Sequence, residues 1–341
     1  MTQPTDQKSI ELALQGGGAH GAFTWGVLDR FLADTRIRIE GISGTSAGAM
    51  NAVVLADGLN RGGVDGAREA LERFWLAVSR AAIASPIRRT PLDRLLGRWS
   101  VDYSPGFVFF DVLTRTVSPY ELNPLNFNPL RDLLAEQVDF DSVRECSGIK
   151  LFVAATNVRT GQAKIFRNRE LSADAIMASA CLPFLYQAVE IEGEAYWDGG
   201  YMGNPVLFPL IDECDARDLV IVQINPIRRN EVPRRAQDIH NRLNEITFNA
   251  SLIKELRSIL LLKGLVDEEG VNRAQFREML LHRIEAEDDL RPLSVSSKLN
   301  AEWDFLMHLH DIGWRRTELW LEQNFDKLGR CSTFDPSFLL K

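Results

Sequence analysis

One serine, held between two regular segments, constrains the fold of this chain more than any other feature. The segment Gly44-Thr45-Ser46-Ala47-Gly48 follows an apolar run at Ile37–Ile42 that predicts a buried strand, and it opens a helix-forming stretch at 47–56. Glycines on both sides of Ser46 permit a sharp turn from strand to helix. Such a turn, a nucleophile elbow, presents the serine at the helix N-terminus, where the amide of Ala47 and the helix dipole favour negative charge.

A similar unit precedes the elbow. Residues 10–14 predict a first buried strand, Gly16-Gly17-Gly18-Ala19-His20-Gly21 is a glycine loop, and residues 22–33 have helical apolar spacing. Alternation of strand, turn and helix predicts a mainly parallel sheet with helices on its faces. Because the glycine loop and the elbow follow adjacent strands, we expect both turns at one edge of that sheet. Further strands are predicted at 149–155, 163–167, 188–191, 195–197 and 219–224.

Composition and charge exclude several classes of protein. With 45% hydrophobic and 25% charged residues the chain is not broadly disordered, and a net charge of −8 argues against a nucleic-acid-binding protein. The four cysteines include no C-x-x-C pair, so we expect free thiols in a reducing cytoplasm rather than disulfides or a zinc site. We find no secretory signal and no apolar run long enough to span a bilayer, so contact with membranes would be peripheral.

The middle of the chain departs from the alternating pattern. The helix that starts at Ala47 is expected to end at Gly58, and an amphipathic helix is expected at 66–82. From Pro86 to Pro129, prolines and aromatic residues break the periodicity. This insert is either a lid or binding loop over a site, or irregular chain whose aromatic side chains are simply buried.

Beyond Pro233 strand signals become rare, and helices are predicted at 235–262, 272–285 and 298–328. We therefore divide the chain into a catalytic domain at 8–230, which contains the insert 86–129, and a helical C-terminal extension at 234–341 packed on it. The last helix carries three tryptophans that could dock on lipid, although packing against the core is the favoured interpretation. They are Trp303, Trp314 and Trp320.

The glycine loop fits two patterns. It matches G-x-G-x-x-G after a strand, and with Glu40 downstream this is typical of a dinucleotide-binding fold. Alternatively, the backbone amides of Gly16, Gly17 and Gly18 form an oxyanion hole that faces Ser46, 28 residues after Gly18. The second interpretation is favoured, because it explains both glycine-rich turns with one site.

A serine nucleophile needs a base, and Asp198 is the preferred candidate. It ends a short apolar strand, and Gly199 and Gly200 predict a tight turn that presents its carboxylate at the strand end. Because a solvated aspartate is a weak base at neutral pH, we expect apolar neighbours such as Trp197 or Leu182 to raise its pKa. A Ser–Asp–His triad stays open as an alternative. The histidines are His20, His240, His282, His308 and His310.

Three motifs in this order resemble the patatin-like phospholipase family: the glycine loop at 16–21, Gly-Thr-Ser-Ala-Gly at 44–48 and Asp-Gly-Gly at 198–200. The segment 178–183 also resembles the family's sequence ahead of the aspartate, and the resemblance extends from residue 10 to about residue 225. It implies a three-layer α/β/α sandwich in which Ser46 is the nucleophile and Asp198 the base. The supporting glycines of the motifs are Gly21, Gly44, Gly48, Gly199 and Gly200.

The resemblance also implies a function and a partner. We expect a lipid acyl hydrolase that acts on a phospholipid ester through transient contact with a membrane surface, without a cofactor or a metal. Gly16, Gly17 and Gly18 would supply the oxyanion hole together with Ala47. The family often has arginine where this chain has His20. The alternatives are a triad esterase, a non-catalytic lipid-binding protein and a dinucleotide-binding oxidoreductase.

Overall fold

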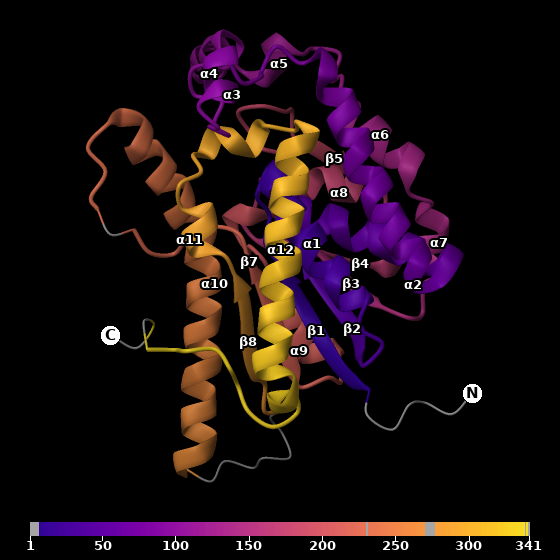
Figure 1. Cartoon of the computed structure of the whole chain (residues 1–341). Helices are drawn as coiled ribbons and strands as arrows, with labels where there is room; N and C mark the ends of the chain where they lie inside the picture. Colours follow the sequence, from indigo (N-terminus) through magenta and orange to yellow (C-terminus); the bar gives the residue numbers. More distant parts are fainter. Residues whose placement is uncertain (1–6, 230, 270–276, 338, 340–341) are drawn as a thin grey trace.

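The computed structural model describes residues 7–229, 231–269, 277–337 and 339 of the chain. Within them, eight strands form one sheet in the order β5-β6-β3-β2-β1-β7-β8, with β4 paired to β3 (Figure 1). Strands β1, β2, β3, β7 and β8 pair in parallel, and β4, β5 and β6 add antiparallel pairs. The strands are β1 Lys8–Leu14, β2 Ile37–Gly44, β3 Lys150–Asn157, β4 Ala163–Arg167, β5 Val189–Ile191, β6 Glu194–Asp198, β7 Asp218–Gln223 and β8 Leu280–Glu285.

Helices cover both faces of the sheet, and short 3-10 segments (η) connect several elements. The helices are α1 Gly21–Leu32, α2 Ala47–Ala81, α3 Pro91–Leu95, α4 Pro105–Thr116, α5 Pro119–Leu122, α6 Pro129–Gln137, α7 Phe140–Glu145, α8 Ala173–Ser179, α9 Phe208–Glu213, α10 Ala236–Glu269, α11 Glu287–Leu290 and α12 Trp303–Asn324. The 3-10 segments are η1 Gly18–His20, η2 Ala82–Ala84, η3 Asn168–Glu170, η4 Gly199–Tyr201, η6 Val295–Leu299 and η7 Phe325–Lys327.

Alternate residues of the central strands enter two separate cores. Leu12 and Val220 belong to the core shared with α1, α2 and α12, whereas Ala13 and Leu219 belong to the core shared with α9 and α10. Successive side chains of a strand point to opposite faces of a sheet, so a strand covered on both faces is apolar throughout. The chain is therefore the three-layer α/β/α sandwich with a mainly parallel sheet that the sequence predicts.

The structure corrects the predicted end of the second helix. Helix α2 runs past Gly58 and is broken instead at Gly62 and Gly63, whose backbone angles are not helical. Gly58 has a packing role, because a Cβ atom there would lie 2.5 Å from the carbonyl oxygen of Gly66. The second half of α2 packs against the first half at this position, and only glycine leaves room for that approach.

The segment after residue 233 is not wholly helical. Residues 280–285, expected within a helix, form strand β8, which pairs in parallel with β7 along its full length. A short apolar run such as Leu280–Ile284 cannot be assigned to helix or strand by periodicity alone, and pairing with β7 decides it. Strand β7 is therefore not the last strand, and residues 270–276 of the predicted helix lie outside the described residues.

The insert at 86–129 also differs from the prediction of irregular chain. Helices α3, α4, α5 and α6 each begin at a proline, which follows a polar or hydroxyl residue in the N-cap position. Proline is favoured in the first helical turn, where its missing N–H has no intrahelical partner. Four of the prolines that break the periodicity, at 91, 105, 119 and 129, thus start short helices, and α3, α4 and α5 gather at the upper end of the molecule (Figure 1).

Helix α12 packs along α1, where two glycines allow a close crossing (Figure 1). A Cβ atom at Gly26 would lie 2.0 Å from the carbonyl oxygen of His310, and one at Gly313 would lie 2.1 Å from that of Phe23. The ring of Trp303 lies 6.0 Å from that of Trp25, so this tryptophan packs on α1. In the part of the chain that the structure describes, no helix combines the length and the apolar character needed to cross a membrane.

Candidate active site

The elbow and the aspartate meet because β2 and β6 share one edge of β3. Strand β2 pairs with residues 150–153 of β3 and ends at Gly44, opposite Val153. Strand β6 pairs with residues 155–157 of β3 and ends at Asp198, opposite Ala155. Strand β4 pairs with residues 152–156 and so occupies the other edge of β3. The ends of β2 and β6 therefore point at each other, and the turns that follow them lie together.

Ser46 has the backbone conformation of a strained turn. Its φ is 54° and its ψ is −119°, and a residue with a Cβ atom rarely adopts a positive φ. Two hydroxyl groups hold the turn in place. Ser179 accepts a hydrogen bond from the Ser46 amide at 2.9 Å, and Thr45 donates one to the carbonyl oxygen of Gly203 at 2.8 Å. The surroundings thus fix a conformation that projects the Ser46 hydroxyl from the end of β2.

The motif glycines are required by close packing. A Cβ atom at Gly48 would lie 2.4 Å from the carbonyl oxygen of Leu14, and one at Gly21 would lie 2.7 Å from the Cβ of Ala47. A Cβ at Gly16 would lie 2.7 Å from that of Ser46. These contacts place the glycine loop directly against the elbow, as the two adjacent parallel strands predict. Gly44 and Gly199 are similarly close to neighbouring backbone.

The amide of Gly16 is already engaged. It donates a hydrogen bond of 2.6 Å to Oδ1 of Asn204, so it does not fit the predicted role of an oxyanion donor. Gly18 has a φ of 57°, and its Cβ position lies 2.5 Å from the carbonyl oxygen of Lys298. Gly16 thus anchors the loop, and the candidate oxyanion donors narrow to the amides of Gly17, Gly18 and Ala47.

Hydrogen bonds of buried amide side chains hold the glycine loop in place. Gln15, at the end of β1, accepts hydrogen bonds from the amides of Ile224 and Asn225, both at 2.9 Å. The side chain of Gln15 donates to Oδ1 of Asn249 at 3.0 Å, and that of Asn225 donates to the carbonyl oxygen of Gly16 at 3.0 Å. Such buried networks, when satisfied, fix a loop in one conformation.

Asp198 is buried beside Ser46. Its Oδ1 accepts a hydrogen bond from the Gly200 amide at 2.7 Å, and the Ser46 hydroxyl lies near enough to the carboxyl to lower its pKa. Burial raises the pKa of Asp198 from 3.8 to about 7, against the opposing effects of the Gly200 amide, the Ser46 hydroxyl and the Lys298 ammonium. The raised pKa agrees with the expectation from the sequence and gives the carboxylate the basicity of a general base near neutral pH.

Ser46 and Asp198 open into one cavity of about 290 Å³. Its walls are mostly apolar, and Leu182 is one of the apolar neighbours expected beside Asp198, whereas Trp197 does not line the cavity. Besides the glycine loop, the lining residues come from α4, from the segment before β5, from α10 and from η6. They include Phe107, Phe110, Asp111, Thr114, Leu185, His240, Asn241, Asn244, Phe248, Ser296, Lys298 and Leu299.

Some aromatic residues of the insert line the cavity, and others are exposed to solvent. Phe107 and Phe110 of α4 line the cavity, whereas Phe109 on the same helix is 69% exposed. Tyr120 and Phe127 are also exposed. The interpretation that these rings are simply buried is therefore wrong, and the insert forms part of the wall beside Ser46.

The structure separates most histidines from Ser46. His282 contacts Asp218 and Thr333, His310 contacts Asp29, and His308 stacks on Trp99. His20 lies at the glycine loop, where its Nε2 is 2.7 Å from the Ser297 hydroxyl. Burial and the nearby Lys298 ammonium lower the pKa of His20 to about 3. Only His240 lines the cavity among the described histidines, so the triad alternative now depends on it.

Glu40 does not lie where the dinucleotide-binding alternative needs an acidic residue. The carboxylate of Glu40 accepts hydrogen bonds from the amides of Asp215 and Ala216, at 2.6 and 3.0 Å. A ribose-binding acid must instead face the glycine loop. The glycine loop packs against Ser46 on one side and against Lys298 on the other. The oxyanion hole is therefore the interpretation that remains for its glycines.

Sequence reasoning missed several residues of the site. No local sequence pattern marks Asn204, Asn225 and Lys298, because the hydrogen-bond partners of their side chains are more than 50 residues away in the chain. Ser179 lies in the segment 178–183 that resembles the family, but no role follows from the sequence for its hydroxyl.

A family model for patatin-like phospholipase matches residues 12–211, which is more than half of the chain and contains the elbow, the glycine loop and Asp198. The chain belongs to the patatin-like phospholipase family. Members of this family are lipid acyl hydrolases, so the match supports hydrolase activity in general. A comparison with curated protein sequences gives no match.

Several solved structures are similar to this chain. VipD from Legionella pneumophila is 16% identical with a TM-score of 0.36, and the match covers 91% of this chain and 67% of VipD. ExoU in its complex with SpcU from Pseudomonas aeruginosa is 19% identical with a TM-score of 0.32, covering 74% of this chain and 52% of that chain. A second ExoU structure is 12% identical with a TM-score of 0.31. This chain spans about half the length of ExoU.

Proposed function

We propose that this patatin-like phospholipase hydrolyses carboxylic esters of lipids with Ser46 as the nucleophile and Asp198 as the general base. The observation that carries the proposal is that both side chains line one largely apolar cavity, with the Ser46 hydroxyl near enough to the Asp198 carboxyl to lower its pKa. A serine in a strained elbow, a buried carboxylate and a glycine loop are the three parts that acyl transfer needs. The apolar walls suit an acyl chain.

In the acylation step, Oγ of Ser46 attacks the ester carbonyl carbon while its proton moves to the Asp198 carboxylate. The carbonyl oxygen becomes an oxyanion, which the amides of Gly17, Gly18 and Ala47 stabilise. Losing one such donor typically costs about 3 kcal/mol of transition-state stabilisation. The tetrahedral intermediate then expels the alcohol, which takes the proton from Asp198, and an acyl-enzyme remains.

In the deacylation step, Asp198 accepts a proton from a water molecule that attacks the acyl carbonyl carbon. The same amides stabilise the second oxyanion, and collapse returns the proton to Oγ of Ser46 and releases the carboxylic acid. Asp198 must be ionised at the start of both steps. Its pKa of about 7 makes it a far better proton acceptor than a solvated aspartate.

The proposal is tested by substitution and by covalent labelling. Ser46→Ala and Asp198→Asn should each abolish hydrolysis of a p-nitrophenyl ester, whereas His240→Ala should leave turnover largely intact. A fluorophosphonate probe should label the wild-type protein at Ser46. Loss of turnover in folded His240→Ala would favour a triad, and absence of both labelling and turnover would favour a non-catalytic lipid-binding protein.

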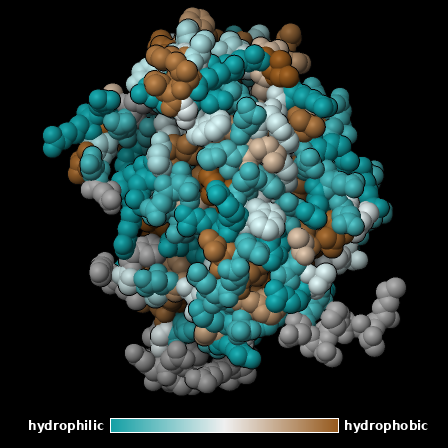
Figure 2. Space-filling model, in the orientation of Figure 1, coloured by the Kyte–Doolittle hydropathy of each residue, from teal (hydrophilic) through white to brown (hydrophobic). Residues whose placement is uncertain are grey.

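We further propose that the insert 86–129 acts as a lid and touches the membrane surface transiently. Exposed apolar side chains on α3 and α4 support this, since Leu95 is 82% exposed and Phe109 69% exposed. Figure 2 shows hydrophobic residues gathered at the upper end of the molecule, over these helices. Phe109→Asp should weaken co-sedimentation with phosphatidylcholine vesicles, and unchanged sedimentation would contradict this contact.

The four free cysteines are in keeping with a cytoplasmic protein.

A further inference from the structure

The cavity beside Ser46 contains one partly buried cation. Lys298 is the one lysine or arginine among the described residues that line it. The residue belongs to η6, which is held against the glycine loop by two contacts. The Lys298 carbonyl oxygen lies 2.5 Å from the Cβ position of Gly18, and the neighbouring Ser297 hydroxyl contacts His20 at 2.7 Å. The lysine is thus fixed beside the proposed oxyanion hole.

The hydrogen-bond partners of the ammonium group are neutral. It donates to Oδ1 of Asn225 at 2.8 Å and to Oδ1 of Asn244 at 3.1 Å, and it lies 5.8 Å from the centre of the Phe248 ring. In the described part of the chain it forms no ion pair, although Asp111 and Asp198 line the same cavity. An ammonium carries three protons, so these two bonds leave one for a ligand.

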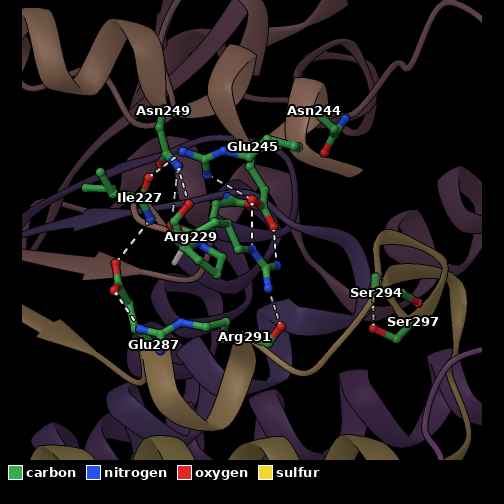
Figure 3. Close-up of polar contacts among 12 residues, drawn as sticks. Ile227, Arg229, Asn244, Glu245, Asn249, Glu287, Arg291, Ser294 and Ser297 are labelled. Atoms are coloured by element: carbon green, nitrogen blue, oxygen red, sulfur yellow. Dashed lines mark hydrogen bonds and ion pairs between the residues drawn. The ribbon is translucent and has the colours of Figure 1, made fainter. Parts of the chain in front are cut away.

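Nearby arginines differ from Lys298 in this respect. Figure 3 shows Arg229 in contact with Glu245, and Arg291 in contact with Glu287. Arg242 also binds Glu245 at 3.0 Å. Buried charges in proteins are normally paired, because an unpaired charge loses its hydration without compensation. The three arginines, which line a neighbouring pocket, follow this rule, whereas Lys298 forms no ion pair with a described residue.

Lys298 and Ser46 line the same cavity, so a phosphate bound at Lys298 would share that cavity with an ester at Ser46. Asn225 accepts a hydrogen bond from Lys298 and donates one to the carbonyl oxygen of Gly16. Gly16 lies directly beside the nucleophile, because a Cβ atom on Gly16 would touch Ser46. One amide side chain therefore links the ammonium to the loop against the nucleophile. In a glycerophospholipid, the phosphate is only a few bonds from the ester carbonyls. We propose that Lys298 binds the phosphate of a phospholipid whose ester carbonyl lies against Ser46, an inference that rests on the proposed function.

The electrostatics agree with this assignment. Burial lowers the pKa of Lys298 to about 8, while the carboxylates of Glu245 and Asp198 oppose the decrease. The ammonium is therefore still mostly charged at neutral pH, and a bound phosphate would stabilise the charge further. His20 stays neutral beside it, so the phosphate site has a single cation.

Binding is measured on the Ser46→Ala background, so that the result does not depend on turnover. The ligands are dihexanoyl phosphatidylcholine and dihexanoylglycerol, both as monomers, which differ in the phosphate-bearing head group and share their acyl chains. Lys298→Met should weaken binding of the phospholipid by about 10- to 100-fold, the range for a hydrogen bond to a charged group. The diacylglycerol should change by much less. Lys254→Met, on the exposed surface of α10, is the matched control and should change neither.

Two further variants protect the test against misfolding. Lys298→Gln retains a donor for the asparagine oxygens and removes the charge, so it should show the same selective loss if Lys298→Met does not fold. Lys298→Arg retains the charge and should restore part of the phospholipid preference. Equal weakening of both lipids in either neutral variant, or no weakening of the phospholipid, would overturn the proposal.

Two additional measurements separate the sources of phosphate and the two proposals. Inorganic phosphate should compete with the phospholipid only weakly, and if it binds through Lys298 while the phospholipid does not, the site belongs to a free anion and the lipid assignment is wrong. In the protein with Ser46 intact, Lys298→Met should lower kcat/KM for the phospholipid more than for the diacylglycerol. Selective phospholipid binding without Ser46-dependent turnover would refute the proposed hydrolase and leave the phosphate site standing.

Discussion

Replacing Asp198 by asparagine should abolish ester hydrolysis and, at the same time, stabilise the fold at neutral and alkaline pH. The carboxyl group is 1% exposed, and burial raises its pKa from 3.8 to about 7. A carboxyl whose pKa is higher in the folded protein than in the unfolded chain binds fewer protons when unfolded at intermediate pH. The free energy of unfolding therefore falls as the pH rises from about 4 to about 7.

The magnitude follows from the size of the pKa change. Each pKa unit corresponds to about 1.4 kcal/mol, so ionised Asp198 costs the folded wild type about 4 kcal/mol above neutral pH. Between about pH 5 and about pH 8, linkage assigns roughly 2.5 kcal/mol of lost stability to this one group. Asparagine has no charge to bury and can still accept the hydrogen bond from the Gly200 amide.

The assay is urea unfolding of wild type and Asp198→Asn at both pH values. The variant should gain stability over the wild type by roughly 2.5 kcal/mol more at about pH 8 than at about pH 5. Asp212→Asn, at an exposed position on α9, controls for removal of one negative charge. If the difference between Asp198→Asn and wild type is the same at the two pH values, the carboxyl is not held at a raised pKa and the base assignment loses its physical support.

Three further outcomes follow from the same geometry. The kcat/KM for a p-nitrophenyl ester should rise with pH around an apparent pKa near 7, because Asp198 must be ionised; a flat profile down to about pH 5 would contradict this. Phe110→Ala should shift the chain-length preference towards longer acyl chains, because removal of this lining side chain enlarges the cavity. Phe109→Ala, on the exposed side of α4, should not change the preference. Gly18→Ala should cost about 1–3 kcal/mol in the free energy of unfolding and reduce turnover, because of its positive φ and the close Lys298 carbonyl. Gly161→Ala has a similar φ but open space around it, so an equal loss in both variants would show that the Lys298 contact adds nothing.

The placement of the candidate site could be predicted from the sequence because its turns are determined by residues close in the chain. Ser46 and Asp198 each follow a short apolar strand and stand beside glycines, and turn geometry of this kind depends on residues close in the chain. The order of the first strands and helices then places both turns at one edge of a parallel sheet. Long-range pairing of β2 and β6 with the same edge of β3 completes the arrangement.

Features that depend on distant partners could not be predicted in this way. Gly58 looks like a helix terminator, but the adjacent chain at Gly66 explains it, and the break falls at residues 62 and 63. Residues 280–285 become a strand because β7 offers an unpaired edge. The Gly16 amide looks available for an oxyanion until Asn204 is placed beside it. In each case a tertiary contact overrides the local pattern.

The segment that matches the family model contains only some of the residues that line the cavity. Residues 12–211 contain the proposed nucleophile, the proposed base and the glycine loop, but they form only part of the wall around them. His240, Asn244 and Lys298 come from the proposed extension at 234–341, and η6 packs directly on the glycine loop. In the proposed mechanism, the family-matched segment thus supplies the bond-breaking groups, which suit any carboxylic ester. We propose that selection among esters depends on the cavity-lining groups that would touch the rest of the substrate, and these lie largely in the insert and in the last third of the sequence.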